Sequence, residues 1–229
     1  MEILYEDNHL IAVNKRPGEI VQGDKTGDMP MSEALKLFLK EKYNKPGNVF
    51  AGVIHRLDRP VSGVVLFAKT SKALERLNQQ FRERQTTKTY WAVVKNKPNP
   101  PAATLIHFLK KNEAQNKSYP GANESGGGLR SELTYHVIAS IENYHLLEVN
   151  PITGRHHQIR VQLSAIGSPI KGDLKYGFPR SNPDGSIHLH ARKLSFSHPI
   201  TGETITISAP PPNTDQVWLQ LAKQVDSAS

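Results

Sequence analysis

The sequence predicts an α+β fold, in which a mixed, largely antiparallel sheet is flanked by a few helices. Short apolar runs bounded by turn residues outnumber the segments with helical periodicity. These strand-like runs do not alternate regularly with helices, as they would in a parallel α/β fold. No internal repeat or linker divides the 229 residues. We therefore expect a single domain spanning residues 1–229, although this length also allows two intertwined halves.

The first half of the chain is expected to contain several strands and two helices. Apolar and β-branched runs predict strands at residues 3–5, 10–15, 64–69, 89–94 and 105–109. Ser32 is expected to cap a helix that ends before Pro46, because apolar residues recur there at spacings of three and four. Ser71 is expected to cap a second helix of the same kind.

The second half continues in the same style. Strands are predicted at residues 133–139, 144–150, 189–191 and 204–208. Thr153 is expected to cap a helix that stops at Gly167, and a short helix is expected at residues 216–223. The polar, glycine-rich stretch 112–130 is expected to be a flexible loop.

Composition points to a polyanionic partner. The chain has 29 Lys and Arg against 21 Asp and Glu, a formal charge of +8, and such an excess favours nucleic acid over a merely basic surface. The absence of cysteine excludes disulfides, thiolate zinc sites and a cysteine nucleophile. The N-terminus has no signal-peptide character, and no apolar run approaches the roughly 20 residues of a membrane helix. We expect a cytoplasmic protein that does not associate with membranes.

The most informative segment surrounds Asp58. This carboxylate lies between Arg56 and Arg59, in a turn that directly precedes the apolar run 64–68. A strand that follows such a turn can hold a carboxylate in a fixed position at its mouth. The flanking guanidinium groups are expected to keep the carboxylate ionised. An ionised group held among arginines is suited to attack on a phosphate-bearing substrate.

Two further groups of residues are candidates for chemistry. Arg155 and Arg160 follow the strand that ends near residue 150, and Arg160 is expected at the edge of a buried helix face, from which it could pair with Asp58. Read alone, both arginines could equally be solvated. Tyr90 follows Lys88 on a predicted strand. A tyrosine there is usually core packing, but beside basic residues it can stack on a base.

Several other functions are disfavoured. The segment beginning at His55 superficially resembles a kinase catalytic loop, but no glycine-rich phosphate loop or Asp-Phe-Gly motif accompanies it. The glycines at 126–128 do not open a helix after a strand, so they are no dinucleotide fingerprint. Neither the pair His156 and His157 nor the pair His188 and His190 supplies the three or four ligands that zinc requires. We therefore expect no metal site.

Taken together, the motifs resemble those of the RluA-type pseudouridine synthases. The matching stretches are His55-Arg56-Leu57-Asp58-x-x-x-Ser62-Gly63, Lys88-x-Tyr90, Pro151-x-Thr153-Gly154-Arg155-x-His157-Gln158-Ile159-Arg160-Val161, Gly167-x-Pro169-Ile170-x-Gly172-Asp173 and Leu189-His190-Ala191. The resemblance covers residues from about Ile3 to Pro212. It implies the catalytic fold of the pseudouridine synthases, without a preceding S4 domain, acting as a monomer on structured RNA, either rRNA or tRNA. It also implies that specific uridines are isomerised to pseudouridine without a cofactor.

The resemblance implies three catalytic residues. Asp58 would be the essential carboxylate, which either adds to C1′ of the ribose or removes a proton from C2′. Arg160 would pair with Asp58 and orient it. Tyr90 would pack against the target base and assist removal of the C5 proton. Only one convincing carboxylate is present, which suits isomerisation better than glycoside hydrolysis with its two carboxylates.

The resemblance also implies three substrate-binding residues. Arg56 would occupy the space that the flipped-out uridine vacates, Leu189 would line the base pocket, and Arg155 would bind RNA. Two positions depart from the family pattern: Val61 stands where threonine is frequent, and Gln162 where histidine is frequent. We expect these to alter local substrate contacts only. The alternatives are a tRNA-specific member of the same family, a nucleosidase or glycosidase that releases uracil, and a non-catalytic RNA-binding protein.

Overall fold

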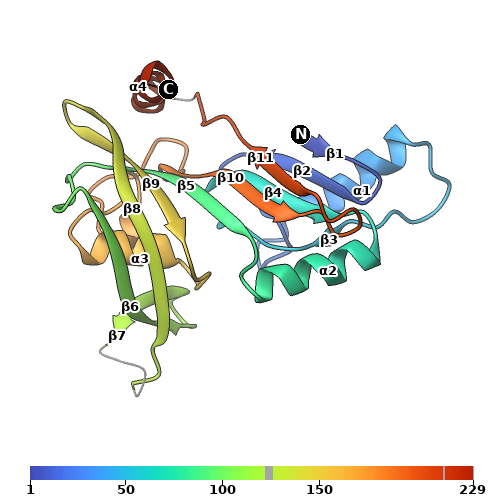
Figure 1. Cartoon of the computed structure of the whole chain (residues 1–229), viewed down its shortest axis with the longest axis horizontal. Coiled ribbons are helices and arrows are strands. Elements are labelled where there is room, and N and C mark those ends of the chain that lie inside the picture. Colours follow the sequence, from blue (N-terminus) through green and yellow to red (C-terminus); the bar gives the residue numbers. More distant parts are fainter. Residues whose placement is uncertain (122–125, 214, 229) are drawn as a thin grey trace. The chain divides into compact units, whose positions relative to one another are not determined.

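The computed structural model describes residues 1–121, 126–213 and 215–228. The chain divides into two compact units that are interleaved in sequence. Unit 1 comprises Met1–Thr87 and Ala191–Pro210, and unit 2 comprises Lys88–His190 and Pro211–Ser229. Figure 1 labels the strands and α-helices of both units. The single domain expected from the sequence remains a prediction.

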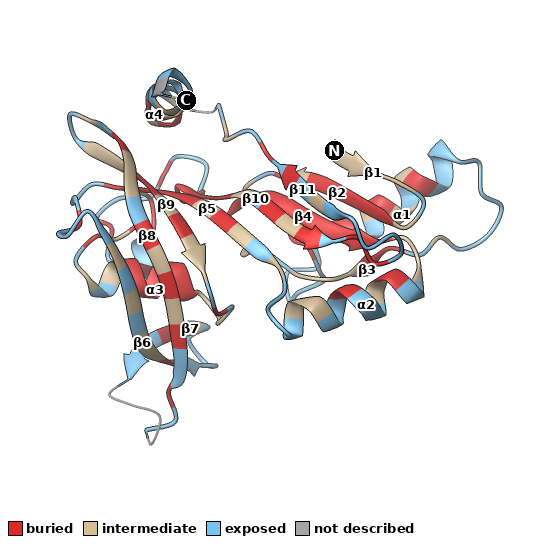
Figure 2. Cartoon of the chain, viewed as in Figure 1, coloured by how far each residue is buried: buried red, intermediate tan, exposed pale blue. Residues whose placement is uncertain are grey.

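Unit 1 is built on a sheet in which β1, β2, β4 and β10 are neighbours in that order, with β3 paired to β4 and β11 to β10. The strand bounds are β1 Glu2–Glu6, β2 Leu10–Lys15, β3 Gly52–Val53, β4 Ser62–Ala68, β10 Leu189–Ser197 and β11 Thr204–Ser208. The pairs β1–β2, β2–β4, β3–β4 and β10–β11 are antiparallel. Every residue of β4 is buried, which makes this strand the centre of the unit (Figure 2).

Two helices accompany this sheet, α1 at Met31–Lys42 and α2 at Ser71–Arg82. Helix α2 runs along β3 and β4 (Figure 1) and buries Leu77 in the core that these strands form. The predicted caps were wrong by one or two residues. Thr70, not Ser71, accepts the N–H of Ala73, and α1 begins after Pro30, whose fixed φ suits a helix start.

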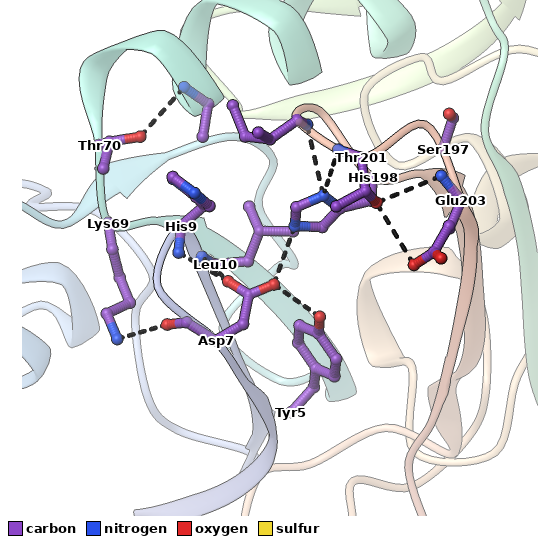
Figure 3. A network of polar contacts seen from close by, with 12 residues as sticks. Tyr5, Asp7, His9, Leu10, Lys69, Thr70, Ser197, His198, Thr201 and Glu203 are labelled. Carbon is purple, nitrogen blue, oxygen red and sulfur yellow. Dashed lines mark hydrogen bonds and ion pairs between the residues drawn. The ribbon is translucent and has the colours of Figure 1, made fainter.

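A polar network joins the β1–β2 turn to the turn between β10 and β11 (Figure 3). The Asp7 carboxylate accepts hydrogen bonds from Tyr5 Oη at 2.6 Å and from the backbone N–H groups of His9 and Leu10, both at 2.7 Å. His198 Nε2 lies 2.8 Å from the same carboxylate. These hydrogen bonds hold the two turns together.

Unit 2 contains an antiparallel sheet in the order β5-β9-β8-β6-β7. The strand bounds are β5 Thr87–Val94, β6 Ala102–Asn112, β7 Lys117–Gly121, β8 Leu129–Ile141 and β9 Tyr144–Pro151. The predicted α+β class with a largely antiparallel sheet is therefore confirmed. Strand β7 contradicts the loop expected at 112–130, and residues 122–125 of that stretch lie outside the described residues. The strand forms because Ser118 is buried and its N–H donates to Tyr176 Oη.

The helices of unit 2 are α3 at Gln158–Ala165, the short 3-10 helix η1 at Leu174–Tyr176, and α4 at Gln216–Ala228. Helix α3 is buried over most of its length (Figure 2) and follows His157, whose φ of 53° is left-handed. Helix α4 places Trp218 and Leu221 in a core with Trp91 and Leu146. Within the described residues, no helix is long and apolar enough to cross a membrane.

Candidate active site

Asp58 lies in a tight turn of unit 1, here called the Asp58 turn (residues 58–61), between β3 and β4. The Val61 N–H donates to the Asp58 carbonyl at 3.0 Å and closes the turn. The Gly18 N–H donates to the Arg59 carbonyl at 2.8 Å and ties the turn to the segment that follows β2. Asp58 is half-buried. The carboxylate is thus carried by a hydrogen-bonded turn at the mouth of a buried strand, as the sequence predicts.

His55 fixes the residues that enter this turn. Its Nε2 accepts a hydrogen bond from the Leu66 N–H at 3.0 Å, so a neutral ring carries its proton on Nδ1. The ring stacks on Phe81 of α2, with centroids 5.1 Å apart. Between His55 and Asp58, the Leu57 side chain is buried and that of Arg56 is exposed. The predicted substrate-binding side chain therefore faces solvent, while its neighbours anchor the loop.

Gly63 is required at the start of β4. Its φ is +114°, and a Cβ atom built on it would lie 2.3 Å from the Ala191 carbonyl oxygen. No side chain can be accommodated at that distance, so β4 approaches β10 this closely only with glycine. Ser62 and Gly63 of the motif are the first two residues of β4. They directly follow the Asp58 turn, so the close approach at Gly63 also fixes the end of that turn.

Lys15 is a residue of this site that sequence reasoning missed. It ends β2 directly opposite Gly63 and is fully buried, at 0% exposure. Its Nζ donates to the carbonyls of Arg16 at 3.1 Å, Arg59 at 3.0 Å and Val61 at 2.6 Å. In the sequence it is a single lysine at the end of a strand, and no local pattern marks it.

The expectation that two guanidinium groups flank the Asp58 carboxylate is wrong for Arg59. Its NH1 donates to Asp28 at 2.6 Å, and its NH2 donates to Asp24 at 3.0 Å and to Thr26 at 2.7 Å. The side chain thus clamps the loop after β2. Adjacent residues in a turn direct their side chains apart, so position in the sequence does not fix the partner.

Arg160 belongs to unit 2, where α3 holds it in a buried pair. Its Nε donates to Asp173 Oδ2 at 2.7 Å and its NH2 to Asp173 Oδ1 at 2.9 Å, a bidentate arrangement. The Arg160 side chain is 6% exposed and that of Asp173 is 1% exposed. The predicted pairing with Asp58, which belongs to unit 1, remains a prediction. Asp173 is the partner that the sequence analysis missed, although it lies within a quoted motif.

An aromatic ring supports the Arg160 guanidinium. The centre of the guanidinium lies 5.0 Å from the centroid of the buried Tyr176 ring. The Tyr176 hydroxyl accepts the Ser118 N–H at 2.9 Å and lies 2.8 Å from His157 Nδ1. The Tyr176 ring of η1 is thus held by Ser118 of β7 and by His157, which precedes α3. This fixed ring restricts the rotamers of Arg160.

The segment before α3 carries Arg155 on a hydrogen-bonded loop. The predicted cap was wrong, because the Thr153 hydroxyl donates to Gln158 Oε1 at 2.8 Å and accepts the Glu132 N–H at 2.8 Å. Gln158 Oε1 also accepts the Arg155 N–H at 2.9 Å, and Arg155 Nε lies 3.4 Å from the Arg130 carbonyl oxygen. Helix α3 therefore starts four residues later than the sequence indicates, after His157 rather than after Thr153.

Tyr90 and Leu189 occupy strands. Tyr90 pairs with Val149 of β9 and is half-buried, while its neighbours Thr89 and Trp91 are buried on the other face of β5. Leu189 is 4% exposed at the start of β10. Thus unit 2 carries Tyr90, Arg155, Arg160 and Leu189, and unit 1 carries Arg56 and Asp58.

The two departures from the family pattern are interior positions. Val61 is 2% exposed. Gln162 is 0% exposed, and its Nε2 lies 3.1 Å from the Leu105 carbonyl oxygen and 3.2 Å from that of Ser131. Both side chains are buried and contact other parts of the protein. They are therefore not exposed to a substrate, and the expected change in local substrate contacts remains a prediction.

The histidines that invited a metal interpretation have protein partners. His156 Nδ1 lies 2.8 Å from Ser118 Oγ, and its Nε2 lies 3.1 Å from Asn116 Oδ1. His188 Nε2 lies 2.7 Å from Asp215 Oδ2. In the part of the chain that the structure describes, no group of three or more His, Asp or Glu residues is arranged to hold a metal ion.

Comparison with known proteins gives a consistent result. A family model described as RNA pseudouridylate synthase matches residues 9–165. The protein named ribosomal large subunit pseudouridine synthase C of Vibrio vulnificus is 35% identical over 214 residues, which cover 91% of this chain and 65% of the relative. Its namesake in Salmonella typhimurium is 34% identical over 229 residues, covering 96% and 70% respectively. This chain thus spans about 65% of the length of the first of these curated relatives.

A solved structure agrees at the level of fold. The protein titled human RNA pseudouridylate synthase domain containing 4 superimposes with a TM-score of 0.78 over 98% of this chain and 93% of that one, at 24% identity. The family match includes the positions of Asp58, Tyr90 and Arg160. The resemblance seen in the motifs is confirmed, and the chain belongs to the RNA pseudouridylate synthase family.

Proposed function

We propose that this chain is an RNA pseudouridine synthase that isomerises specific uridines of large-subunit ribosomal RNA, acting as a monomer in the cytoplasm. Family membership supports the reaction, and the printed names of the curated relatives favour ribosomal over transfer RNA. The charge of +8 is suited to a polyanionic substrate. The observation that carries the proposal is a half-buried Asp58 on a turn held by buried groups.

The reaction rearranges one nucleotide. The N1–C1′ bond breaks, the uracil rotates, and a C5–C1′ bond forms as the C5 proton is lost and N1 gains one. Substrate and product are isomers, so the overall change consumes no oxidant, reductant or second substrate. The target uridine cannot react within a stack and must be flipped out first.

Asp58 acts at the ribose in this proposal, either by adding to C1′ or by removing the C2′ proton. Either step needs a carboxylate held close to one position of the sugar. A reacting group that is held in place before substrate binds contributes to catalysis, because less entropy is lost on reaching the transition state. The hydrogen bonds of the Asp58 turn, the His55 anchor and Gly63 support such a role.

Arg160 orients Asp58 from its pair with Asp173. A guanidinium has five N–H donors, and the bidentate pair uses two of them. A second carboxylate is therefore compatible with the same guanidinium. Tyr90 packs against the base and assists removal of the C5 proton. Its half-buried position on β5 is compatible with this role.

The remaining predicted residues bind RNA. The exposed Arg56 fills the gap in the stack that the uridine leaves, with its planar guanidinium against neighbouring bases. Arg155 contacts the backbone, and the apolar side chain of Leu189 lines the base pocket.

The test incubates the purified chain with large-subunit rRNA and bulk tRNA from cells that lack this gene. Carbodiimide labelling then maps pseudouridine, and chromatography measures uracil. We expect pseudouridine at specific sites of rRNA, no released uracil, and loss of at least about 1000-fold in rate for Asp58→Asn, because a group that reacts covalently or as a base has no substitute. RNA binding by Asp58→Asn should be nearly unchanged.

Other outcomes would overturn parts of the proposal. Modification of tRNA alone would contradict the rRNA assignment, and released uracil would indicate a glycosidase. RNA binding without any product would leave a binding protein. Wild-type turnover by Asp58→Asn would remove Asp58 from the reaction.

A further inference from the structure

Lys15 is among the largest fully buried side chains in the described part of the protein, at 0% exposure. Lysine is almost never fully buried without partners, because its ammonium loses hydration. Here the ammonium donates to three main-chain carbonyls, those of Arg16, Arg59 and Val61. An ammonium has three N–H donors, so donors and acceptors match in number.

Two of these three acceptors belong to the Asp58 turn. The Arg59 carbonyl, 3.0 Å from Nζ, follows Asp58 directly, and the Val61 carbonyl, 2.6 Å away, ends the turn. The Arg59 carbonyl also accepts a hydrogen bond from the N–H of Gly18, three residues after Lys15. The backbone after Asp58 is therefore fixed mainly by the segment 15–18. The direction of the Asp58 side chain depends on that backbone.

The charged groups that act on Lys15 are Glu19, Asp58 and Arg59. Burial lowers the pKa of Lys15 to about 8, which Glu19 and Asp58 oppose and Arg59 reinforces. The ammonium therefore loses its proton as pH rises through about 8. A neutral amine has two N–H donors and a lone pair, so one of the three carbonyls would then face a lone pair.

We propose that the Lys15 ammonium is a positioning residue for the isomerisation, which orients the Asp58 carboxylate by holding the carbonyls of Arg59 and Val61. This inference rests on the proposed function. Lys15 touches neither substrate nor reacting atoms in this role, because it is fully buried.

The proposal predicts opposite trends for activity and stability at alkaline pH. Turnover should fall as pH rises through about 8, because Lys15 loses its proton. The pKa of Lys15 in the folded protein lies below its ordinary 10.5, so the unfolded chain binds the proton more tightly. Between these values the Lys15 contribution to stability rises with pH. General alkaline unfolding would lower both quantities together.

The experiment compares Lys15→Met with Lys69→Met as a matched control. Lys69 lies in the same unit, has an 11% exposed side chain, and donates to Glu6 at 2.8 Å and to the Asp7 carbonyl at 2.6 Å (Figure 3). Its contacts are with Glu6 at the end of β1, with the Asp7 carbonyl and with the Tyr43 ring, and not with the Asp58 turn. Turnover, RNA affinity and thermal unfolding are measured from pH 6.5 to 9, a window of about one unit or more on each side of the Lys15 pKa.

We expect Lys15→Met to lower kcat by roughly 100-fold, because a small misplacement of a reacting group has an effect of that size. RNA affinity should change by less than about 3-fold, since the lost interaction concerns the transition state. The decline above pH 8 that we expect for wild type should be absent from Lys15→Met and present in Lys69→Met. A folded Lys15→Met protein with wild-type kcat, or with an unchanged alkaline decline, would overturn the proposal.

Lys15→Arg keeps the test decisive if the methionine variant does not fold. Its guanidinium stays protonated throughout the range, so the alkaline decline should move to higher pH. An unmoved decline in this variant would also overturn the proposal.

Amide hydrogen exchange separates this inference from the proposed function. The N–H groups of Val61 and Gly18 should exchange at least about 10-fold faster in Lys15→Met than in Lys69→Met, with no substrate present. Unchanged protection would contradict the role of Lys15 even in an active enzyme. Lost protection in a chain whose wild type forms no pseudouridine would instead contradict the proposed function.

Discussion

At the scale of single residues, the site depends on partners that lie far from it in the sequence. The sequence identifies Asp58, Tyr90 and Arg160 because each lies in a motif. It does not identify Lys15, which is 43 residues before Asp58 and reaches the turn only through the pairing of β2 with β4. The candidate catalytic residues can be recognised from short motifs. The groups that hold them in place, such as Lys15, come from distant parts of the sequence and reach the site only through the fold.

Asp173 gives a prediction at this scale. In Asp173→Asn the buried Arg160 would lose the charged half of its bidentate pair within unit 2, so its guanidinium should lose its fixed orientation. We expect kcat to fall by roughly 100-fold with little change in RNA affinity, and stability to fall by about 3 kcal/mol, as on breaking a buried ion pair. Single-turnover kinetics, RNA titration and denaturant unfolding measure these quantities.

A matched substitution serves as the control for that prediction. Asp184 lies in the same unit but is exposed, and its carboxylate accepts hydrogen bonds from the N–H and hydroxyl of the nearby Ser186. Asp184→Asn should keep wild-type turnover. A well-folded Asp173→Asn protein with the same turnover as this control would show that Arg160 needs no second carboxylate.

At the scale of elements, strands were easier to predict than helix starts. The strands at 10–15 and 204–208 have the predicted bounds, because apolar runs between turn residues define both ends. Helix α3 begins at Gln158 because the Thr153 hydroxyl is engaged with Glu132 and Gln158. Strand β7 forms around Ser118 through a bond to Tyr176. Such long-range hydrogen bonds override local preference, so no local pattern could have predicted them.

The N-terminal hairpin gives a prediction about acid stability. Burial opposes ionisation of Glu6, but hydrogen bonds from Lys42, Lys69 and Tyr43 outweigh it and lower the pKa of Glu6 to about 2. Since this pKa lies below the ordinary 4.5, the stabilisation is present above pH 4.5 and is lost as pH falls towards 2. Glu6→Gln should lower the free energy of unfolding at pH 7 by about 1 kcal/mol, allowing for partial exposure of the partners.

Urea unfolding at several pH values tests this prediction. The difference between wild type and Glu6→Gln should shrink between pH 4.5 and 2. A difference that stays constant through this window would mean that the Glu6 carboxylate is not the stabilising group. Turnover should be unaffected, because Glu6 contacts Lys42 of α1 and Lys69, which follows β4, rather than the Asp58 turn.

At the scale of the whole molecule, the proposed reaction draws on both units. Asp58 belongs to unit 1, whereas Tyr90 and Arg160 belong to unit 2. The motifs occur in the family order along the chain. The two units do not follow the order of the sequence, because residues 191–210 belong to unit 1 together with residues 1–87. A sequence read from end to end suggests one continuous domain for this reason. Strands β10 and β11 belong to unit 1 because β10 pairs with β4 and β11 pairs with β10. No linker or change in composition in the sequence indicates this pairing.

The net charge of +8 predicts how the whole molecule binds its substrate. If most of the affinity comes from displaced counterions, the logarithm of the RNA association constant should fall linearly with the logarithm of salt concentration. Contacts with about five to eight phosphates would reduce affinity by roughly 100- to 10,000-fold between 50 and 200 mM salt.

Asp58→Asn should show the same slope of affinity against salt as wild type, because this residue acts at the sugar. Arg155→Ala should lower the slope by about one phosphate contact. Fluorescence anisotropy with a labelled rRNA fragment measures each slope, and affinity that does not depend on salt would refute an electrostatic mode of RNA binding.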